Sequence, residues 1–260
     1  MPGRDLIRRV LILGGTGEAR DLAARAVAAF GSRVEIVTSL AGRTRLPASP
    51  AGAMRVGGFG GAEGLATYLR DSRIDAVIDA THPFAATMSA NARDAAAASG
   101  VPLLTLLRPV WMPGPGDRWT EVADAAEAAG TVARLGMRVF LSFGGRELDA
   151  FAALRDKWFL VRRIDPPEEN LPLAQYALSL GRGPFSVEDE RRLLEAHRID
   201  VVVTKASGGE ATRAKLDAAR ALGLPVVMIR RPLAVGPGVS SAEDALRWLD
   251  TILFGQGARS

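Results

Sequence analysis

The sequence contains no cysteine and is poor in histidine. Without cysteine, the 260-residue chain has no disulfide, no thiolate nucleophile and no cysteine-ligated metal site. Its two histidines, His82 and His197, leave few ligands for a zinc or iron site. These absences favour a protein without a resident metal, and the lack of disulfides suits a cytoplasmic location.

Long hydrophobic runs are also missing. No apolar stretch approaches the ~20 residues that a membrane span needs, and no secretory leader pattern opens the chain. We therefore expect no membrane segment. Hydrophobic residues make up 48% of the chain and charged residues 24%, which is typical of a globular domain, and the length suits one large domain or two small ones.

Positive charge is in slight excess, with a formal net charge of +4. The basic residues are dispersed rather than clustered, and aromatic residues make up only 6% of the chain. Nucleic-acid binders concentrate basic side chains on one surface, so we expect no nucleic-acid partner. An anionic small-molecule ligand explains the same balance more economically. The sequence leaves the oligomeric state open.

The most informative stretch is RVLILGGTGEAR, residues 9–20. Its apolar run at 10–13 predicts a strand buried on both faces, and a helical pattern runs from Glu18 to about Phe30. Between them lies a turn of Gly14, Gly15, Thr16 and Gly17. Glycines let the backbone approach a phosphate, and the free N–H groups and dipole of the following helix attract it. The stretch therefore predicts a phosphate site.

Two kinds of phosphate-binding motif contain a glycine turn of this type, the P-loop and the dinucleotide motif. A P-loop is excluded, because no Gly-Lys-Ser/Thr follows the glycines. Gly15 and Gly17 match the first two glycines of the dinucleotide motif G-x-G-x-x-G, whereas Arg20 stands at the third position. A turn that merely joins strand to helix is the alternative.

A second strand is expected at 33–38, and the residues after it bear on cofactor choice. Proteins that prefer NAD place an acidic residue near this strand end, whereas an arginine suits the 2′-phosphate of NADP. Glu35 lies inside the strand, and Arg43 follows its end. The pattern favours NADP, and a solvated loop arginine is the alternative.

Strands and helices alternate along the rest of the chain. Further strands are predicted at 54–56, 74–80, 101–107, 138–141, 158–164, 176–180, 199–203 and 225–229. Helices are predicted at 62–70, 83–99 with Pro83 in the first turn, 123–135, 147–154, 186–197 with Ser186 and Asp189 as a capping box, 211–222 and 242–253. A proline- and glycine-rich connection occupies 108–119. We predict an α/β fold of two Rossmann-like parallel-sheet domains, residues 1–112 and 113–260, with the ligand cleft between them.

Polar residues gather where the predicted strands end, which is where parallel sheets bind ligands. Lys205 and the Ser207–Gly208 pair could form a second anion site, and a surface lysine is the alternative. His82, with a reference pKa of ~6.5, could bond a nicotinamide or donate a proton, or it could only stabilise the turn before Pro83. We interpret His197 as structural.

Two other catalytic classes find no support. The chain has no G-x-S-x-G nucleophile elbow. Short-chain reductases usually need Tyr-x-x-x-Lys, but Tyr68 and Tyr176 are followed four residues later by Ser72 and Leu180.

Five motifs together resemble the precorrin-6A reductase family of cobalamin (vitamin B12) biosynthesis, which includes cobalt-precorrin-6A reductases. They are GGTGEAR at 14–20, TSLAGRT at 38–44, DATHPFA at 79–85, SFGGRE at 142–147 and TKASGGEATRAKLDAAR at 204–220. The resemblance covers nearly the whole chain and includes Arg20, which lies in the family's own EAR motif. It implies an oxidoreductase that uses NADPH to reduce one double bond (a CH–CH group, with NADP as acceptor) of precorrin-6A, giving precorrin-6B.

The resemblance also implies roles for particular residues. Gly15, Thr16 and Glu18 would line the cofactor near its phosphates, and Ser39, Gly42, Arg43 and Thr44 its 2′-phosphate. Thr81, His82, Pro83 and Phe84 would lie near the nicotinamide, and Lys205, Ser207 and Gly208 would approach from the other half. His82 is a candidate proton donor beside solvent. Candidates for binding the ring carboxylates, chosen for their place at strand ends, are Arg146, Arg162, Arg163 and Arg182.

Three alternatives stay open at this point. The chain could be a non-catalytic, NADP-sensing Rossmann regulator, or another NADP-dependent reductase. Within the family, the ring could arrive metal-free or already carrying cobalt.

Overall fold

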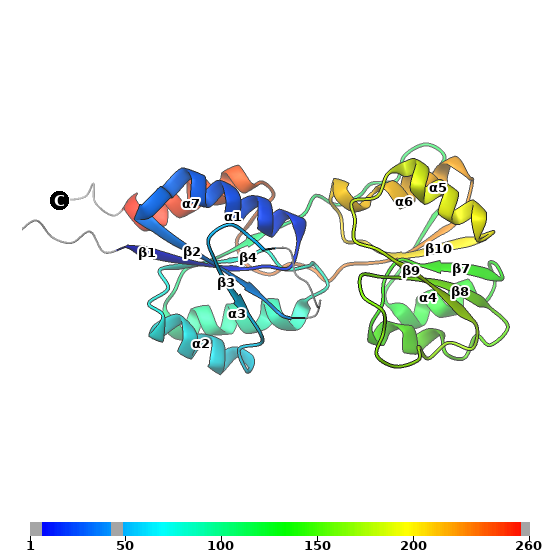
Figure 1. Cartoon of the computed structure of the whole chain (residues 1–260), viewed down its shortest axis with the longest axis horizontal. Coiled ribbons are helices and arrows are strands. Elements are labelled where there is room, and N and C mark those ends of the chain that lie inside the picture. The colour runs from blue at the N-terminus through cyan, green and yellow to red at the C-terminus, as the bar shows by residue number, and fades with distance from the viewer. Residues whose placement is uncertain (1–6, 43–48, 256–260) are drawn as a thin grey trace, which may run out of the picture. The chain divides into compact units, whose positions relative to one another are not determined.

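The computed structural model describes residues 7–42 and 49–255, which form two compact α/β units (Figure 1). Unit 1 contains the chain up to Arg108 and again from Pro232, and unit 2 contains Pro109–Arg231. The α/β class with two parallel sheets is confirmed. The predicted boundary is wrong for the described residues 232–255, which belong to the first unit and not to the second. Helical periodicity located the last helix but carried no information about which sheet it covers.

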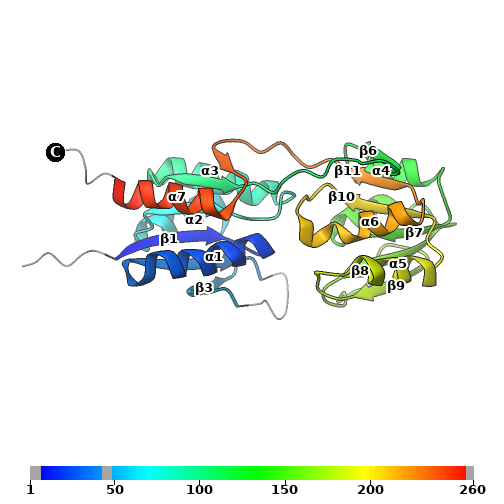
Figure 2. The ribbon, with the colours of Figure 1, turned by 90° about the horizontal axis from the view of Figure 1, so that it is seen from above.

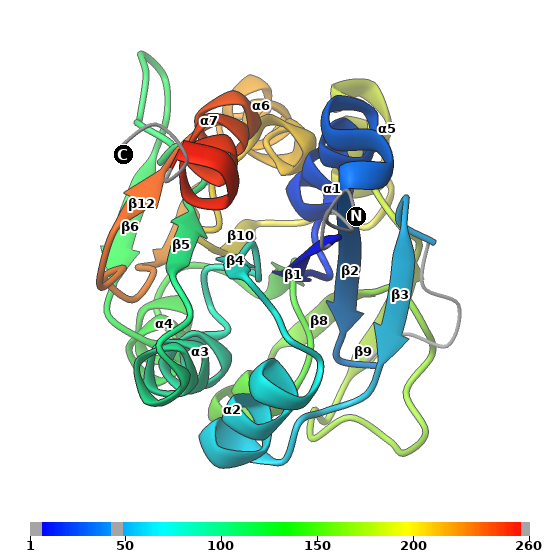
Figure 3. The same ribbon diagram turned by 90° about the vertical axis from the view of Figure 1, so that its left-hand side faces the viewer.

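The sheet of unit 1 consists of parallel strands in the order β3-β2-β1-β4-β5-β12 (Figure 3). The strands are β1 (Arg8–Leu13), β2 (Val34–Leu40), β3 (Ala53–Val56), β4 (Ala76–Asp79), β5 (Leu103–Leu106) and β12 (Gly238–Val239). This is the doubly wound order in which the chain reverses direction across the sheet between β1 and β4. Ligands of such sheets bind at that switch point, beyond the carboxyl ends of the strands.

Helices cover both faces of this sheet. The helices α1 (Gly17–Phe30) and α7 (Ala242–Phe254) lie side by side on one face (Figure 2). The helices α2 (Gly61–Asp71) and α3 (Ala86–Ser99) cover the other, and a short 3₁₀ turn, η1 (Gly31–Arg33), leads into β2 (Figure 1). Val10 and Ile12 pack toward α1 and α7, whereas Leu11 and Leu13 pack toward α2 and α3. Successive side chains of a strand point to opposite faces, which is why the whole run is apolar.

The start of α3 differs from the prediction. Pro83 was expected in its first turn, but the helix begins at Ala86. The chain first makes a separate turn, in which the N–H of Ala85 donates to the carbonyl of His82 at 2.7 Å. The N–H of Phe84 donates to Nδ1 of His82, so this turn satisfies its own donors before the helix starts.

Unit 2 has a parallel sheet in the order β9-β8-β7-β10-β11-β6. Its strands are β6 (Trp119–Val122), β7 (Arg138–Leu141), β8 (Trp158–Arg163), β9 (Tyr176–Leu180), β10 (Val201–Lys205) and β11 (Val226–Ile229). The helices α5 (Val187–Ala196) and α6 (Ala214–Ala221) cover one face and α4 (Ala125–Val132) the other (Figure 1). The remaining helical pieces are two 3₁₀ turns, η2 (Arg146–Phe151) and η3 (Glu210–Thr212). The first replaces the α-helix predicted at 147–154.

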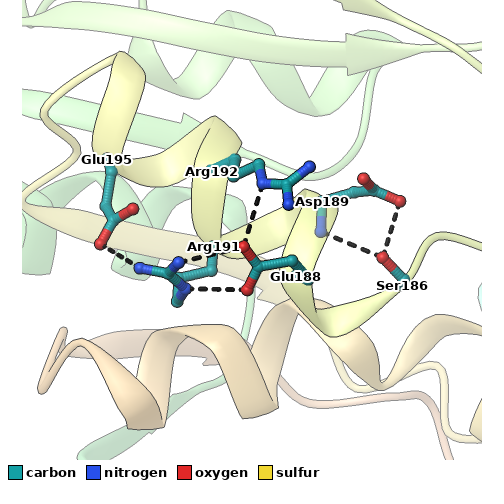
Figure 4. Close-up of polar contacts among 6 residues, drawn as sticks. All are labelled: Ser186, Glu188, Asp189, Arg191, Arg192 and Glu195. Atoms are coloured by element: carbon teal, nitrogen blue, oxygen red, sulfur yellow. Dashed lines mark hydrogen bonds and ion pairs between the residues drawn. The ribbon is translucent and has the colours of Figure 1, made fainter.

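Ser186 caps α5 as predicted, and Asp189 three residues later is its partner (Figure 4). The Ser186 hydroxyl accepts the N–H of Asp189 at 3.0 Å and donates to the Asp189 carboxylate at 2.6 Å. Beyond the cap, Arg191 pairs with Glu188 and Glu195, and Arg192 also pairs with Glu188. The Arg191 hydrogen bond lowers the pKa of the Glu188 carboxyl. These charged side chains lie on the solvent-exposed face of α5 and at no strand end, so they are not part of a ligand site.

Candidate active site

The glycine turn of residues 14–17 follows β1 at the switch point of unit 1. The N–H of Gly14 donates to the Ser39 carbonyl at 2.9 Å, and a Cβ at Gly14 would lie 2.8 Å from the Thr38 methyl group. Gly15 has a φ of +104°, and no atom of the described residues lies within 4 Å of the position a Cβ would take. Glycine is therefore required here by conformation, and the space above the turn is open to a ligand.

Thr16 fixes the turn to the neighbouring strand. Its buried hydroxyl accepts the N–H of Ala19 at 3.0 Å, which caps α1, and donates to the Ala80 carbonyl at 2.9 Å, just beyond β4. Both bonds use the side chain, so what Thr16 offers a ligand is its backbone. Thr16 thus satisfies the N–H of Ala19, and the other N–H groups at the start of α1 are of the kind that anions bind.

Glu18, the second residue of α1, has an internal partner that the sequence did not suggest. Its carboxylate lies 2.7 Å from the guanidinium of Arg108, which follows β5. The Arg108 side chain is only 10% exposed, and burial lowers its pKa against the opposing effect of Glu18. The only sequence signal for Arg108 is its place just beyond a strand and before a proline.

The ends of β2 and β3 form a second part of the same edge. Ser39 is buried, and its hydroxyl lies 3.4 Å from the guanidinium of Arg55 in β3. Arg55 also donates to the carbonyls of Gly57 at 2.6 Å and Gly58 at 2.8 Å, and stacks 3.8 Å from the Phe59 ring centroid. Sequence reasoning missed Arg55, although an arginine just before the glycine-rich stretch 57–61 was a visible signal.

Of the four residues predicted for the 2′-phosphate, two are described by the structure. Ser39 lies at the end of β2, and Gly42, with a φ of +73°, lies exposed just beyond it. Arg43 and Thr44 lie outside the described residues.

The end of β4 presents the Thr-His-Pro-Phe segment. Asp79 is buried and accepts both the N–H of Thr81 at 3.1 Å and its hydroxyl at 2.7 Å. His82 is exposed, and its Nδ1 accepts the N–H of Phe84 at 3.2 Å. A neutral imidazole whose Nδ1 accepts carries its proton on Nε2. Thr81 and His82 are thus both held by hydrogen bonds within the segment.

These three strand ends share one edge of one sheet. The register pairs Leu13 with Ser39 and with Asp79. The glycine turn, the end of β2 and the Thr-His-Pro-Phe segment are thus neighbours, as the clustering of polar residues at strand ends predicted.

Lys205, Ser207 and Gly208 lie at the switch point of unit 2, between β7 and β10. Lys205 forms an ion pair with Glu147, and its side chain is 15% exposed, with Nζ 5.5 Å from the Phe143 ring centroid. Ser207 and Gly208 are buried just beyond, and Gly208 has a φ of +69°. Lys205 is therefore a partly buried cation at a strand end and not a solvated surface lysine.

The four predicted substrate arginines differ in what their guanidinium groups contact. Arg162 is paired with the buried Glu190 and lies over the rings of Phe140 and Phe185, at 4.9 and 4.1 Å. It serves the interior of the unit. Arg163 covers Gly144 and donates to the Asp165 carbonyl at 3.2 Å. Arg146 and Arg182 are exposed.

The site has no grouping of metal ligands in the described residues, and the described helices do not suit a membrane. Within residues 7–42 and 49–255, no group of three or more histidine, aspartate or glutamate side chains could hold a metal ion. Over the same residues, no helix combines the length and apolar character needed to cross a membrane.

Comparison with known proteins places the chain. A family model described as precorrin-6x reductase CbiJ/CobK matches residues 9–250. The chain is 54% identical to a precorrin-6A reductase of Rhodococcus erythropolis, over 94% of this chain and 98% of that protein. It is 31% identical to a cobalt-precorrin-6A reductase of Salmonella typhimurium, over 92% and 96% of the two chains.

A solved structure agrees with these matches. The structure of CobK precorrin-6A reductase is similar with a TM-score of 0.87 at 44% identity, covering 94% of this chain and 97% of that one. The matched region includes both sheets, the glycine turn and the strand ends described above. The chain therefore belongs to the precorrin-6x reductase family.

Proposed function

We propose that this chain is an oxidoreductase of cobalamin biosynthesis that uses NADPH to reduce one double bond of precorrin-6A, giving precorrin-6B. Membership of the precorrin-6x reductase family and the 54% identity to a named precorrin-6A reductase support the reaction class and the substrate. The observation that carries the cofactor proposal is the open glycine turn at the switch point of unit 1. Its conformation and its uncovered surface suit the approach of a phosphate.

Unit 1 offers the groups that a bound dinucleotide needs. The N–H groups of the glycine turn and of the start of α1 would hold the pyrophosphate. Ser39 and Gly42, with Arg43 and Thr44, would bind the 2′-phosphate that distinguishes NADPH from NADH. When bound, NADPH supplies the hydride, so the protein needs no nucleophile of its own.

The Thr-His-Pro-Phe segment would position the nicotinamide end and the proton. Asp79 locks Thr81 through two hydrogen bonds, which fixes the backbone that leads to His82. His82 is then the candidate donor of the proton that the reduction requires besides the hydride, and it donates as the imidazolium, because a neutral ring would be left as an imidazolate. Solvent is the competing donor, and a His82→Gln variant distinguishes the two, because solvent donation leaves the rate at saturating substrate unchanged.

Cations at the strand ends of unit 2 fit the charge of the substrate. The precorrin ring carries several acetate and propionate carboxylates, which guanidinium and ammonium groups bind well. Arg146, Arg163, Arg182 and Lys205 are the candidates, whereas the buried pairing of Arg162 makes it a residue of the interior. That Lys205, Ser207 and Gly208 contact the cofactor stays a separate prediction.

We further propose that the ring arrives without cobalt. Relatives named precorrin-6A reductase are 45–54% identical to this chain, whereas those named cobalt-precorrin-6A reductase are 29–31% identical. The difference supports a metal-free substrate, and parallel assays with the two rings test it directly.

One experiment tests the proposal as a whole. Purified protein is titrated with NADPH and NADH, and precorrin-6A is then added anaerobically while NADPH absorbance is followed. Selective NADPH binding with consumption on addition of the ring is the expected result. Binding without consumption of NADPH by either ring would instead favour a nucleotide-sensing regulator, and binding of neither nucleotide would contradict the cofactor assignment.

A further inference from the structure

Arg108 and Glu18 bring together two parts of unit 1 that are far apart in sequence. Arg108 lies just beyond β5, after Leu107, and Glu18 is the second residue of α1, which starts beyond β1. Strand β4 lies between β1 and β5 in the sheet. The 2.7 Å ion pair therefore spans the carboxyl edge at the switch point, beside the glycine turn.

The location of Glu18 raises an electrostatic problem for a phosphate site. The first turn of a helix attracts one anion, through its free N–H groups and its dipole. A carboxylate at the second helical position is itself attracted by the helix N-terminus, and it repels a second anion nearby. An uncompensated Glu18 would thus compete with the cofactor pyrophosphate for the same positive field.

Arg108 resolves this competition by neutralising the carboxylate. Its side chain is 10% exposed, and burial strengthens the attraction between the two charges relative to water. Unit 2 repeats the arrangement, because Glu147 follows the glycines after β7 and is paired with Lys205 at the end of β10. In both units, the acid that follows the first glycine turn is paired with a cation from another strand end, two strands away in unit 1 and on the adjacent strand in unit 2.

We propose that Arg108 is a positioning residue of the cofactor site, which holds Glu18 in a neutral pair and thereby keeps the glycine turn able to bind the cofactor pyrophosphate. The inference rests on the proposed function, since it concerns the same site. Pyrophosphate is common to NADPH and NADH, so Arg108 acts equally on both, in contrast to the groups assigned to the 2′-phosphate.

The test uses the full chain and four variants. Arg108→Met leaves the Glu18 charge uncompensated, Arg108→Lys keeps the cation, and the double variant Arg108→Met/Glu18→Gln removes both charges. Arg25→Met is the matched control, because Arg25 pairs with Asp21 on the same helix α1 at 2.8 Å but on the exposed surface. Dissociation constants for NADPH and NADH are measured by titration, KM and kcat by NADPH consumption, and folding by thermal melting.

We expect Arg108→Met to weaken both nucleotides roughly ten-fold, as one uncompensated charge near a phosphate would. Arg108→Lys and the double variant should bind within about three-fold of the wild type, and Arg25→Met should be unchanged. KM for NADPH should rise in Arg108→Met while kcat at saturation is kept. A merely structural Arg108 would instead lower the active fraction, and with it kcat, at constant KM.

Two outcomes overturn the inference. In the first, Arg108→Met binds NADPH as the wild type does. In the second, its loss of affinity persists after Glu18→Gln is added, although the double variant melts at the wild-type temperature. A wild-type chain that binds neither nucleotide is a different failure, because it removes the proposed function and the inference with it.

Discussion

The two units repeat one structural plan in detail. Five strands of each sheet have the same spatial order, β3-β2-β1-β4-β5 in unit 1 and β9-β8-β7-β10-β11 in unit 2. The sixth strand, β12 or β6, is added at the edge. Arg73 and Arg198, with φ values of +51° and +49°, each lie two residues before an aspartate that precedes the fourth strand of the order. Asp75 accepts the N–H of Arg9 at 2.7 Å, and Asp200 accepts the N–H of Arg138 at 2.8 Å. The aspartates thus fix the same two strands to each other in both units.

The units differ at the turn after the first strand of the shared plan along the chain, which is β1 in unit 1 and β7 in unit 2. In unit 1 the turn is open above Gly15 and leads into the 14-residue helix α1. In unit 2 the Arg163 side chain covers Gly144, the Glu147 carboxylate approaches Gly145, and only the 3₁₀ turn η2 follows. A shared strand order therefore does not make two equal nucleotide sites. An uncovered glycine turn followed by an α-helix is the combination that suits a phosphate, and within the described residues it follows β1 but not β7.

The largest expected effect comes from closing the open turn. Gly15→Val places a β-branched side chain at a φ of +104° and in the space proposed for the pyrophosphate. We expect NADPH affinity to fall at least roughly 100-fold, as the loss of a phosphate site and a strained backbone imply. Isothermal titration of the variant with NADPH measures the loss.

Gly145→Val is the matched control in unit 2. Gly145 has a similar φ of +98°, so the substitution strains the backbone comparably, and its Cβ would in addition lie 3.2 Å from the Glu147 carboxylate. It should lower the melting temperature about as much as Gly15→Val does while leaving NADPH affinity within a few-fold. Equal losses of affinity in the two variants would contradict the assignment of the nucleotide to unit 1.

The next largest effect is expected in unit 2, at the switch point between β7 and β10, where side chains cover the glycine turn. Lys205→Met removes the cation paired with Glu147. We expect kcat/KM for precorrin-6A to fall by roughly 10- to 100-fold, the range of a lost charged hydrogen bond. Steady-state rates measured at varied ring and varied NADPH tell which ligand Lys205 serves, because the affected KM belongs to that ligand. Unchanged kinetics would show that Lys205 only pairs with Glu147 and contacts neither ligand.

The sequence was most informative where burial or backbone conformation leaves little choice. The apolar runs that became β1 and β10 are buried from both faces, and no other environment accepts them so well. The glycine turn was recognisable because a strand, three glycines and a helix start follow one another directly. These features are local, so a local pattern suffices to predict them.

Features that depend on distant partners could not be predicted in the same way. The edge strands β6 and β12 are short and lie next to proline and glycine, and only pairing with β11 and β5 makes them strands. Arg108 was missed because its partner Glu18 is brought near by the order of the strands. Arg162 was selected as a substrate residue because it lies near a strand end. Its side chain points to the face covered by α5, however, where Glu190 binds it.

A moderate effect on cofactor choice is expected at the end of β2. Arg43→Ala should weaken NADPH binding about ten-fold and leave NADH binding nearly unchanged, because only NADPH carries the 2′-phosphate. The ratio of the two dissociation constants is the measurement. This outcome would also separate Arg43 from Arg108, whose removal should affect both nucleotides equally. Equal losses for the two nucleotides would remove Arg43 from the 2′-phosphate role.

The smallest effects are expected from features that both units share. Ser186 caps α5 in unit 2 and Ser241 caps α7 in unit 1, each accepting an N–H three residues on at 3.0 Å. Ser186→Ala and Ser241→Ala should each lower stability by about 1 kcal/mol, or about 2–4 °C in melting temperature. Both caps follow edge strands, β9 and β12, and neither lies at the switch point, so NADPH affinity should stay unchanged in both. If either variant lost NADPH affinity at a temperature where it is fully folded, its helix cap would contribute to the cofactor site. The difference between the units would then extend beyond the turns that follow β1 and β7.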